Sequence, residues 1–324
     1  GLYGYTDQAR ENELSITVAA RGTIGFTAIR RKPFLPVVRL ITVVPDTEKV
    51  SERYLYYALK NCKPQSSGTS IPQLTVPDIK KNSLELYEIS KQEKIADQLD
   101  KVNKIILLRK HELLMLDNLI KARFVEMFED YYKKHINEKR LDEVCDFIDY
   151  RGKTPEKSKF GIPLITAKNV KDNRFSIEPQ EFIPEENYDT VMTRGIPKIN
   201  DVLFTTEAPL GNVCRIPAVY EKFCVGQRLI TMQPHEGIIN PEYLEHALTS
   251  AEFQKKMGQK SSGSTVKGIR SKLLVLLTIP IPPIELQNQF ADFLRAIDKS
   301  KLEVQKALDK TQILFDSLMQ QYFG

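Results

Sequence analysis

Apolar residues recur at steps of three, four or seven over a long stretch that begins near residue 90. Ser90-Lys91-Gln92-Glu93 has the spacing of a helix capping box, and neither Pro nor Gly follows it through Arg151. The recurring positions form a narrow seam typical of a coiled coil: Ile95, Leu99, Val102, Ile106, Leu113, Leu116, Ile120 and Met127. The pattern therefore predicts a long helix that needs a helical partner.

A second seam of the same kind follows Pro282-Pro283 and supplies that partner. Its positions are Phe290, Leu294, Ile297, Val304, Leu308, Phe315, Leu318 and Tyr322. Val304 stands where the first seam has Arg109. Helices of roughly 35 to 40 residues span on the order of 55 to 60 Å. Antiparallel pairing would hold the segments that precede them at opposite ends, related by an approximate twofold axis.

Those preceding segments carry a different pattern. Short β-branched and aromatic runs are interrupted by Gly and Pro, as in Ser15 to Val18, Val37 to Val44 and Asp201 to Thr205. This pattern predicts β-rich units.

The whole arrangement occurs twice. Gly25 matches Gly211, Arg39-Leu40-Ile41-Thr42 recurs as Arg228 to Thr231, and Tyr54-Leu55 recurs as Tyr243-Leu244. A slight shift of register between these matches marks an insertion in the second copy. Ser66 to Thr69 then matches Ser261 to Ser264, and one constant register holds from Gln92/Gln287 through Phe128/Phe323. Each copy is therefore expected to contain a β-rich unit, a Ser-Ser-Gly turn and a long helix.

These features resemble the DNA-specificity subunits of Type I restriction-modification systems. The resemblance rests on the duplicated order of unit, Ser-Gly turn and helix, on Ile279-Pro280-Ile281-Pro282-Pro283-Ile284-Glu285-Leu286-Gln287, and on the segments from Ala19 to Gly25 and from Glu207 to Val213. It implies an α+β fold in which two β-rich target-recognition domains are separated by an antiparallel coiled coil. The expected divisions are a partial first domain at 1–89, a helix at 90–135, a second domain at 136–284 and a helix at 285–324.

The resemblance also implies a function without catalysis. Each target-recognition domain would recognise one half of a split sequence in double-stranded DNA, and the helices would set the spacer between the halves. Two methyltransferase subunits would bind the chain and bring restriction subunits with them. S-adenosylmethionine, ATP and magnesium would belong to these partners, and this chain would hold no cofactor or metal. The cytoplasm is the expected compartment.

The first copy departs from the second in one respect. No counterpart of about Arg140 to Val191 precedes Gly25. A truncated chain, omitted residues or a shorter type of recognition domain would each account for this difference.

Base recognition requires side chains with paired hydrogen-bonding groups, and phosphate contacts require basic side chains or loop amides. The candidate DNA-binding residues are Arg21, Arg30, Arg31, Lys32, Ser67, Thr69, Lys153, Lys157, Lys168, Asn169, Lys171, Arg174, Asn212, Ser264, Thr265, Lys267 and Arg270. Solvated loops, a helix cap or a hairpin tip would explain the same residues without DNA. Arg215, Gln227 and Arg228 also have suitable chemistry, but Arg228 duplicates Arg39 in a predicted strand, which favours a structural part for it.

Composition changes this picture little. A formal net charge of +5 permits polyanion binding without proving it. The four cysteines form no CxxC pair, which favours buried, reduced thiols. Gly152-Lys153-Thr154 lacks the earlier glycine of a phosphate-binding loop, and the histidines have no metal-ligand spacing. Two alternatives stay open: a fragment of a fused restriction-methylation enzyme, and a coiled-coil scaffold that binds protein.

Overall fold

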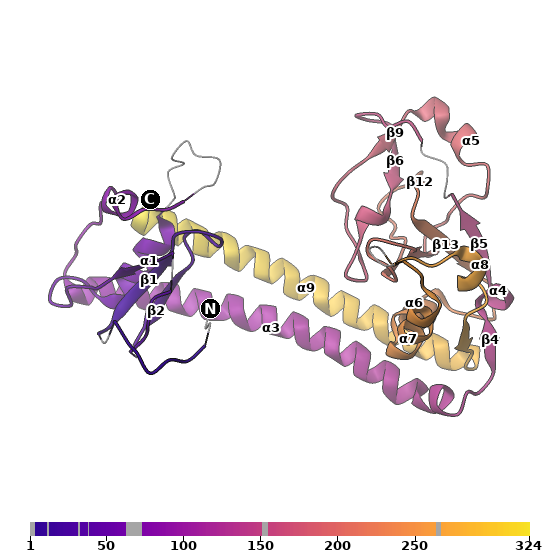
Figure 1. Cartoon of the computed structure of the whole chain (residues 1–324), viewed down its shortest axis with the longest axis horizontal. Coiled ribbons are helices and arrows are strands. Elements are labelled where there is room, and N and C mark those ends of the chain that lie inside the picture. The colour runs from indigo at the N-terminus through magenta and orange to yellow at the C-terminus, as the bar shows by residue number, and fades with distance from the viewer. Residues whose placement is uncertain are drawn as a thin grey trace. The chain divides into compact units, whose positions relative to one another are not determined.

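A computed structural model describes residues 4–11, 13–31, 33–37, 39–62, 73–150, 155–263 and 267–324. The chain divides into two compact units (Figure 1). Unit 1 contains residues 1–115 and 301–324, and unit 2 contains residues 116–300. The two longest helices, α3 (Ile89–Lys133) and α9 (Ile284–Phe323), each contribute a segment to both units.

The described residues of unit 1 form an antiparallel sheet in the order β2-β1-β3. Its strands are β1 (Ser15–Ala19), β2 (Thr27–Arg30) and β3 (Leu40–Val43), followed by the helices α1 (Glu52–Asn61) and α2 (Val76–Lys80). Ile16 and Val18 of β1 are fully buried because they pack with Leu59 of α1 and with Leu74. The predicted β pattern is therefore confirmed here.

Unit 2 contains a sheet of the same kind with one more strand, in the order β11-β10-β13-β5. These strands are β10 (Val202–Thr205), β11 (Val213–Arg215), β13 (Leu229–Pro234) and β5 (Cys145–Asp149). The extra strand β5 pairs antiparallel with β13. It lies within the segment from about Arg140 to Val191, for which the sequence of the first copy has no counterpart.

Small elements complete unit 2. A second sheet has the order β12-β6-β9, and two pairs of short strands, β7-β8 and β14-β4, stand apart from it. The strands are β4 (Glu138–Arg140), β6 (Ile162–Ile165), β7 (Val170–Lys171), β8 (Arg174–Phe175), β9 (Phe182–Ile183), β12 (Cys224–Val225) and β14 (Thr278–Pro280). The helices are α4 (Leu141–Val144), α5 (Tyr188–Val191), α6 (Pro241–Thr249), α7 (Ala251–Lys260) and α8 (Ser271–Leu274), with 3-10 turns at Ala167–Asn169 and Glu185–Asn187.

The structure repeats the glycine turn that follows β1 in unit 1 and β10 in unit 2. Gly25 and Gly211 have φ angles of 82° and 86°, a conformation that glycine adopts without steric cost. The amide of Gly25 donates to the Ala19 carbonyl at 2.9 Å, and the amide of Gly211 donates to the Thr205 carbonyl at 2.9 Å. The sequence duplication therefore corresponds to a duplicated backbone.

The two arginines of the repeat also adopt one conformation. Arg39 and Arg228 have φ angles of 79° and 66°, and their carbonyls accept hydrogen bonds from Ala20 at 2.8 Å and Thr206 at 3.0 Å. The prediction that Arg228 lies in a strand is wrong, because it ends the turn before β13. Its backbone is structural, and its side chain is free to point elsewhere.

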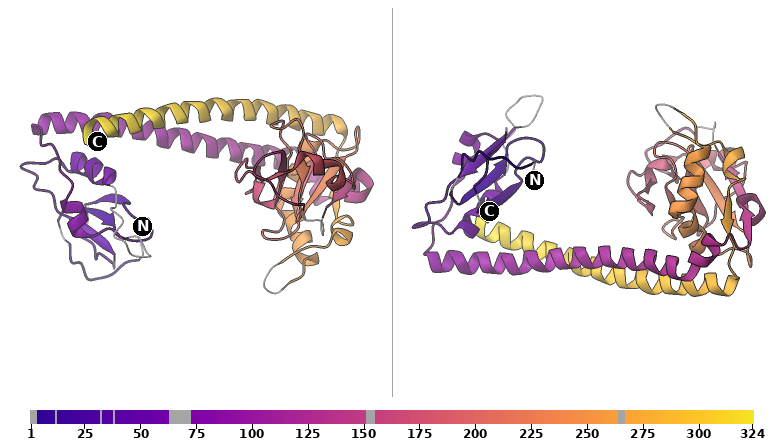
Figure 2. Two further views of the ribbon diagram at one scale, coloured as in Figure 1. Left: turned by 90° about the horizontal axis from the view of Figure 1, so that it is seen from above. Right: turned by 60° about the horizontal axis from the view of Figure 1, so that its bottom comes forward.

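The long helices lie side by side within each unit (Figure 2). In unit 1, the Tyr322 hydroxyl donates to Gln98 at 2.9 Å, and Arg109 donates to the Ala307 carbonyl and the Thr311 hydroxyl. Residue numbers rise along α3 as they fall along α9, so the helices are antiparallel.

The predicted seam residues divide between two hydrophobic clusters. Ile95, Leu99, Val102, Ile106, Leu308 and Phe315 are buried in unit 1, with Leu113 packed against them. Ile120, Phe290, Leu294 and Ile297 are buried in unit 2, with Leu116 and Met127 packed against them. Val304 is half-buried and belongs to neither cluster. Cys145, Cys214 and Cys224 are buried free thiols, and Cys62 is half-buried.

Candidate nucleic-acid interface

A cleft of about 620 Å³ opens in unit 2 between two groups of loops. One group surrounds β6, β7 and β8, and the other comprises the turn after β10 and the turn before β13. Lysines, an asparagine, a glutamine and an arginine are among the side chains that line it: Lys157, Lys168, Lys171, Asn212, Gln227 and Arg228. The cleft therefore combines cationic groups with side chains able to make paired hydrogen bonds.

A single half-buried carboxylate holds two of these lysines. The Lys157 and Lys168 ammonium groups each lie 2.8 Å from an oxygen of Glu181. Burial opposes ionisation of Glu181, but hydrogen bonds from both lysines outweigh it and lower the pKa of this carboxyl. The Lys157 and Lys168 side chains remain 49% and 63% exposed, so their charge reaches solvent beside the cleft.

The hairpin between β7 and β8 places Lys171 at the same cleft. Asp172 and Asn173 form its turn with φ angles of 48° and 58°, the left-handed conformation that a two-residue hairpin requires. The Asn173 side chain accepts from the Val213 amide at 2.9 Å, which attaches the hairpin to β11.

Asn212 also connects the loops that enclose the cleft. Its side-chain nitrogen donates to the Val170 carbonyl at 3.2 Å, and its backbone amide donates to the Thr205 hydroxyl at 2.8 Å. Arg228 lies across the same cleft and pairs with Glu207 at 3.1 Å, with 60% of its side chain exposed. The sequence shows the suitable chemistry of Gln227 and Arg228, but neither is among the candidate DNA-binding residues predicted from it, although both line the cleft. Their chemistry was a usable signal, but the fold alone shows where they point.

Two candidates from this region have other partners. The Asn169 side chain donates to the carbonyls of Ser176 at 2.9 Å and Pro179 at 3.1 Å, and accepts from the Thr166 amide at 2.9 Å. Asn169 is buried, so the structure uses it inside the loop and not at the surface expected for a DNA contact. Arg174 points to α3, where it pairs with Asp117.

Arg215 is not part of the cleft. It pairs with Glu242 at 3.0 Å and with Glu245 at 2.7 Å, which fastens β11 to α6. Lys267 and Arg270 are exposed near the end of β10, because Gly268 bridges to Glu207.

Three candidate DNA-binding arginines of unit 1 already contact other side chains of the protein. The Arg21 guanidinium donates to Gln73 at 2.8 Å, and Arg30 donates to a threonine of β1 at 3.3 Å. Arg31 pairs with Glu52 at the start of α1. Six further candidates lie outside the described residues: Lys32, Ser67, Thr69, Lys153, Ser264 and Thr265.

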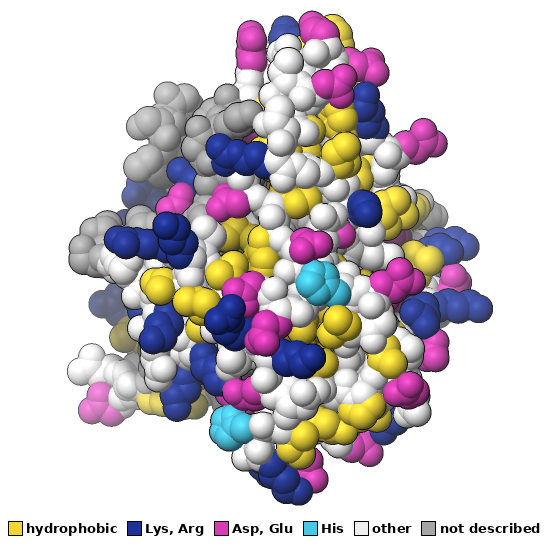
Figure 3. Space-filling view, turned by 90° about the vertical axis from the view of Figure 1, so that its right-hand side faces the viewer, with side chains coloured by type: hydrophobic (Ala, Val, Ile, Leu, Met, Phe, Trp, Pro, Cys, Tyr) yellow, Lys and Arg dark blue, Asp and Glu magenta, His cyan; other side chains and the backbone are white. Residues whose placement is uncertain are grey.

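The face of unit 2 shown in Figure 3 carries lysines and arginines interspersed with acidic and apolar side chains. No single basic area dominates this face. The particular side chains that line the cleft, and not a broad basic area on this face, indicate nucleic-acid binding.

One group of side chains among the described residues could hold a metal ion: His135, Glu138 and Glu252, whose ligand atoms lie within 4.8 Å of one another. The Lys256 ammonium lies 3.0 Å from Glu138 and 2.9 Å from Glu252, so a cationic side chain already pairs with both carboxylates. The helices of the described residues include none long and apolar enough to cross a membrane.

Comparison with known sequences identifies a family. The model of the Type I restriction modification DNA specificity domain matches residues 1–116 and 133–312. Two relatives from Mycoplasma pneumoniae, the C-terminus of one putative type I specificity subunit and a second, longer one, are each 41% identical over 96 residues, or 30% of this chain. The matched region spans 66% of the first relative and 28% of the second. The Type I restriction enzyme MjaVIII specificity subunit of Methanocaldococcus jannaschii is 24% identical over 81% of this chain and 68% of its own length.

Solved structures show the same fold. The S subunit of a type I restriction-modification system from M. genitalium matches 99% of this chain and 86% of its own, with a TM-score of 0.56 at 18% identity. A chain from a study of complex assembly and conformational transition of the type I R-M system matches 98% of this chain and 84% of its own, with a TM-score of 0.58 at 17% identity. Because the family model covers most of the sequence, the chain belongs to the family of Type I restriction modification DNA specificity domains.

Proposed function

We propose that this protein recognises DNA for a Type I restriction-modification complex, each unit binding one half of a bipartite duplex sequence. One observation carries the proposal: a duplicated backbone presents different side chains. Asn212 follows the glycine of the turn in unit 2, whereas Phe26, 54% exposed, follows it in unit 1. Two recognition surfaces of one fold and unlike chemistry suit an asymmetric target, because unlike side chains select unlike base edges.

The cleft of unit 2 supplies both kinds of contact that duplex recognition needs. Lys157, Lys168 and Lys171 provide charge for phosphates, and Asn212 with Arg228 provides groups of the kind that pair with base edges. The Arg228–Glu207 ion pair is exposed, so a base could replace the carboxylate at little cost.

The long helices support a second part of the proposal, the binding of two methyltransferase subunits. Four apolar side chains of α3 are exposed at heptad spacing, namely Leu107 (58%), Leu108 (57%), Leu114 (55%) and Met115 (51%). They lie on the side of the helix away from two seam positions, the buried Ile106 and the half-buried Leu113. An exposed apolar stripe of this kind is typical of a protein-binding surface.

Catalysis and cofactors belong to the partners in this proposal. S-adenosylmethionine would bind to the methyltransferase subunits, and ATP and magnesium to the restriction subunits recruited with them. The cytoplasm, where the DNA is, would be the compartment.

Footprinting of the chain reconstituted with its methyltransferase subunits tests the proposal. We expect protection of a split sequence, and weaker protection when Lys157 and Lys171 are replaced by alanine. Lys255→Ala, at an exposed position of α7 in the same unit, is the matched control and should leave protection unchanged. Binding without sequence preference at any salt concentration would contradict the proposal.

The two alternatives give different results. Methyl transfer by the isolated chain with S-adenosylmethionine would show a fragment of a fused enzyme. Binding to methyltransferase subunits without protection of DNA would show a scaffold.

A further inference from the structure

The first turns of α3 and of α9 each contain a buried glutamine. This glutamine binds the start of the short helix that precedes it in the same copy of the repeat, α1 for α3 and α6 for α9. Gln92 accepts from the Ser51 amide at 2.9 Å, and Gln287 accepts from the Asn240 amide at 2.9 Å. The side-chain nitrogen of each donates to a carbonyl five residues earlier in the chain, at 2.7 Å in both cases. We call these contacts the glutamine anchors. They dock α1 on α3 in unit 1, and α6 on α9 in unit 2, with the same geometry.

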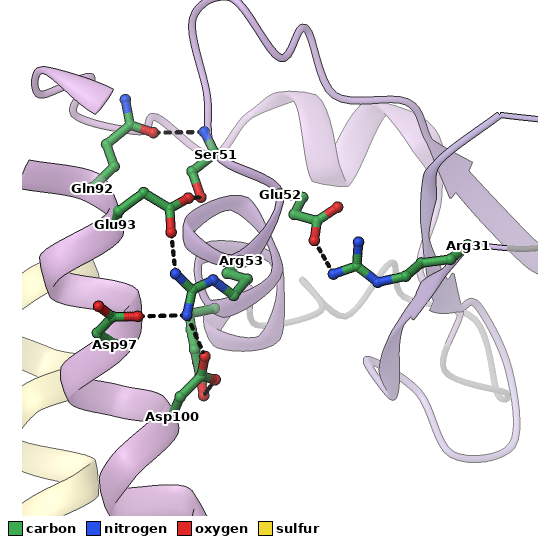
Figure 4. A network of polar contacts seen from close by, with 9 residues as sticks. Arg31, Ser51, Glu52, Arg53, Gln92, Glu93, Asp97 and Asp100 are labelled. Carbon is green, nitrogen blue, oxygen red and sulfur yellow. Dashed lines mark hydrogen bonds and ion pairs between the residues drawn. The ribbon is translucent and has the colours of Figure 1, made fainter. Parts of the chain in front are cut away.

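Beside the first anchor, one cation faces three carboxylates (Figure 4). Arg53 of α1 pairs with Asp97 at 2.6 Å, with Asp100 at 2.9 Å and with Glu93. The Ser51 hydroxyl also donates to Glu93. The start of α3 is therefore an acidic surface that receives a basic residue.

Beside the second anchor, two of the matched charges are reversed, while Asp97 keeps an acidic counterpart in Asp292, which pairs with Arg295. The residue that matches Arg53 is Glu242, and the residue that matches Asp100 is Arg295. Glu242 lies 3.8 Å from the Arg295 guanidinium and 3.0 Å from Arg215. An acidic residue of α6 therefore meets a basic residue of α9.

The neighbouring polar pair differs as well. Where Ser51 donates to Glu93 in unit 1, the Asn240 side chain of unit 2 donates to Asn288 at 3.1 Å. The carboxylate Glu93 thus has the neutral amide Asn288 as its counterpart, so α9 lacks the charge that α3 presents at this point.

We propose that the two junctions form a matching code, by which each long helix accepts its own β-rich unit and rejects the other. The anchors are identical, so shape alone does not distinguish the units. Docking of an α6-type helix on α3 would bring Glu242 against Glu93, Asp97 and Asp100. Docking of an α1-type helix on α9 would bring Arg53 against Arg295. It would leave Arg53 one carboxylate, Asp292, in place of three. Like charges in contact reject the wrong partner, while opposite charges stabilise the right one.

The partner that the code excludes is a second copy of this chain or a related one. Duplicated elements that share an anchor are prone to exchange between copies, because the same contacts form in either arrangement. The code restricts docking to the matched combination. This inference concerns assembly of the fold, and it does not depend on DNA binding.

Hydrogen exchange of the α1 amides in the full chain tests the code. Arg53→Glu gives α1 the acidic residue of α6 and creates the mismatch. We expect the α1 amides to exchange roughly 5- to 30-fold faster than in the wild type. Arg53→Gln, which removes the charge without reversing it, should show a smaller increase. Raising the salt concentration to about 1 M should reduce the difference between these variants, because the repulsion is screened.

A compensating change completes the test. Asp97→Arg, added to Arg53→Glu, returns an opposite charge to α3 and spares Asp100, which accepts from the Tyr57 hydroxyl at 2.6 Å. It should recover much of the lost protection. Lys104→Glu is the control: like Arg53→Glu it replaces a basic residue with an acidic one, but at an exposed position of α3. It should not change the exchange of the α1 amides.

The corresponding change in unit 2 is Arg295→Asp, which should weaken protection of the α6 amides more than Arg295→Gln does. The code is wrong if Arg53→Glu exchanges no faster than Arg53→Gln. It is equally wrong if salt leaves their difference unchanged, or if Asp97→Arg brings no recovery.

Discussion

Individual side chains distinguish the two units more than their backbones do. Gly25 and Gly211 form the same turn, and Arg39 and Arg228 the same bend, so these residues fix the position of the loops. The adjoining residues are free to differ. The sequence showed both the repeated and the changed residues, but it did not show that Gln227 and Arg228 face a cleft, because that depends on contacts between distant loops.

Charge and base recognition in unit 2 should separate by residue. Lys171→Ala should weaken binding of the reconstituted complex to all sequences and reduce the slope of log K against log salt by about 0.9, as expected for one lost phosphate contact. Arg228→Ala should instead relax preference at one base pair, by about 1–3 kcal/mol. Binding measured over a salt series on matched and mismatched duplexes distinguishes the two. Equal effects of Arg228→Ala on every duplex would show that it selects no base.

Unit 1 should lose stability in acid through Glu93. A hydrogen bond from Ser51, opposed by burial and reinforced by Arg53, lowers the pKa of this carboxyl below its usual 4.5. The unfolded chain therefore takes up this proton at higher pH than the folded chain does. The contribution of Glu93 is full above the usual value and is lost as pH falls through the folded value.

Hydrogen exchange of α1 over a pH series, corrected for intrinsic rates, measures this loss. Glu93→Gln should flatten the dependence below about pH 4.5. An unchanged profile in that variant would place the acid sensitivity elsewhere.

At the scale of elements, the long helices were the most predictable part of the fold. Their apolar seams repeat over many helical turns, so the helical period can be recognised in the sequence many times over. The first helix nevertheless ends at Lys133, well before the next glycine, and His135 and Asn137 leave it with φ angles of 49° and 50°. The sheet β12-β6-β9 was not predictable, because its strands are two to four residues long and show no alternation.

Arg109 of α3 and Thr311 of α9 form a polar contact in the helix seam of unit 1. The stability of the fold should depend on whether one or both of these side chains are replaced. Arg109 donates to Thr311, whose side chain is buried. Thr311→Val removes the hydroxyl and should lower the free energy of unfolding by about 1–3 kcal/mol, because the guanidinium loses a buried acceptor.

Arg109→Met combined with Thr311→Val replaces both groups with apolar ones and should recover most of that loss. Urea unfolding monitored by hydrogen exchange of the α3 amides measures the free energy of unfolding of both variants. A double variant no more stable than Thr311→Val would show that the contact contributes packing only.

At the scale of the whole molecule, the duplication predicted the two related units, but the charge reversal at their junctions could not be read from it. Arg53 and Glu242 are simply unlike residues until their partners Asp100 and Arg295 are known. The helical segments remain a proposed spacer. Deleting one heptad from α3 should change the number of unread base pairs or prevent assembly with the methyltransferase subunits. Complexes that assemble and protect the original spacing would contradict the proposed spacer.

Mapping of methylated positions in the genome of a host that carries the complete system tests the central claim most directly. We predict a bipartite motif with unlike halves. Joint replacement of Asn212, Gln227 and Arg228 should alter one half and leave the other half unchanged. A continuous motif, or replacement that alters both halves together, would contradict recognition by two separate units.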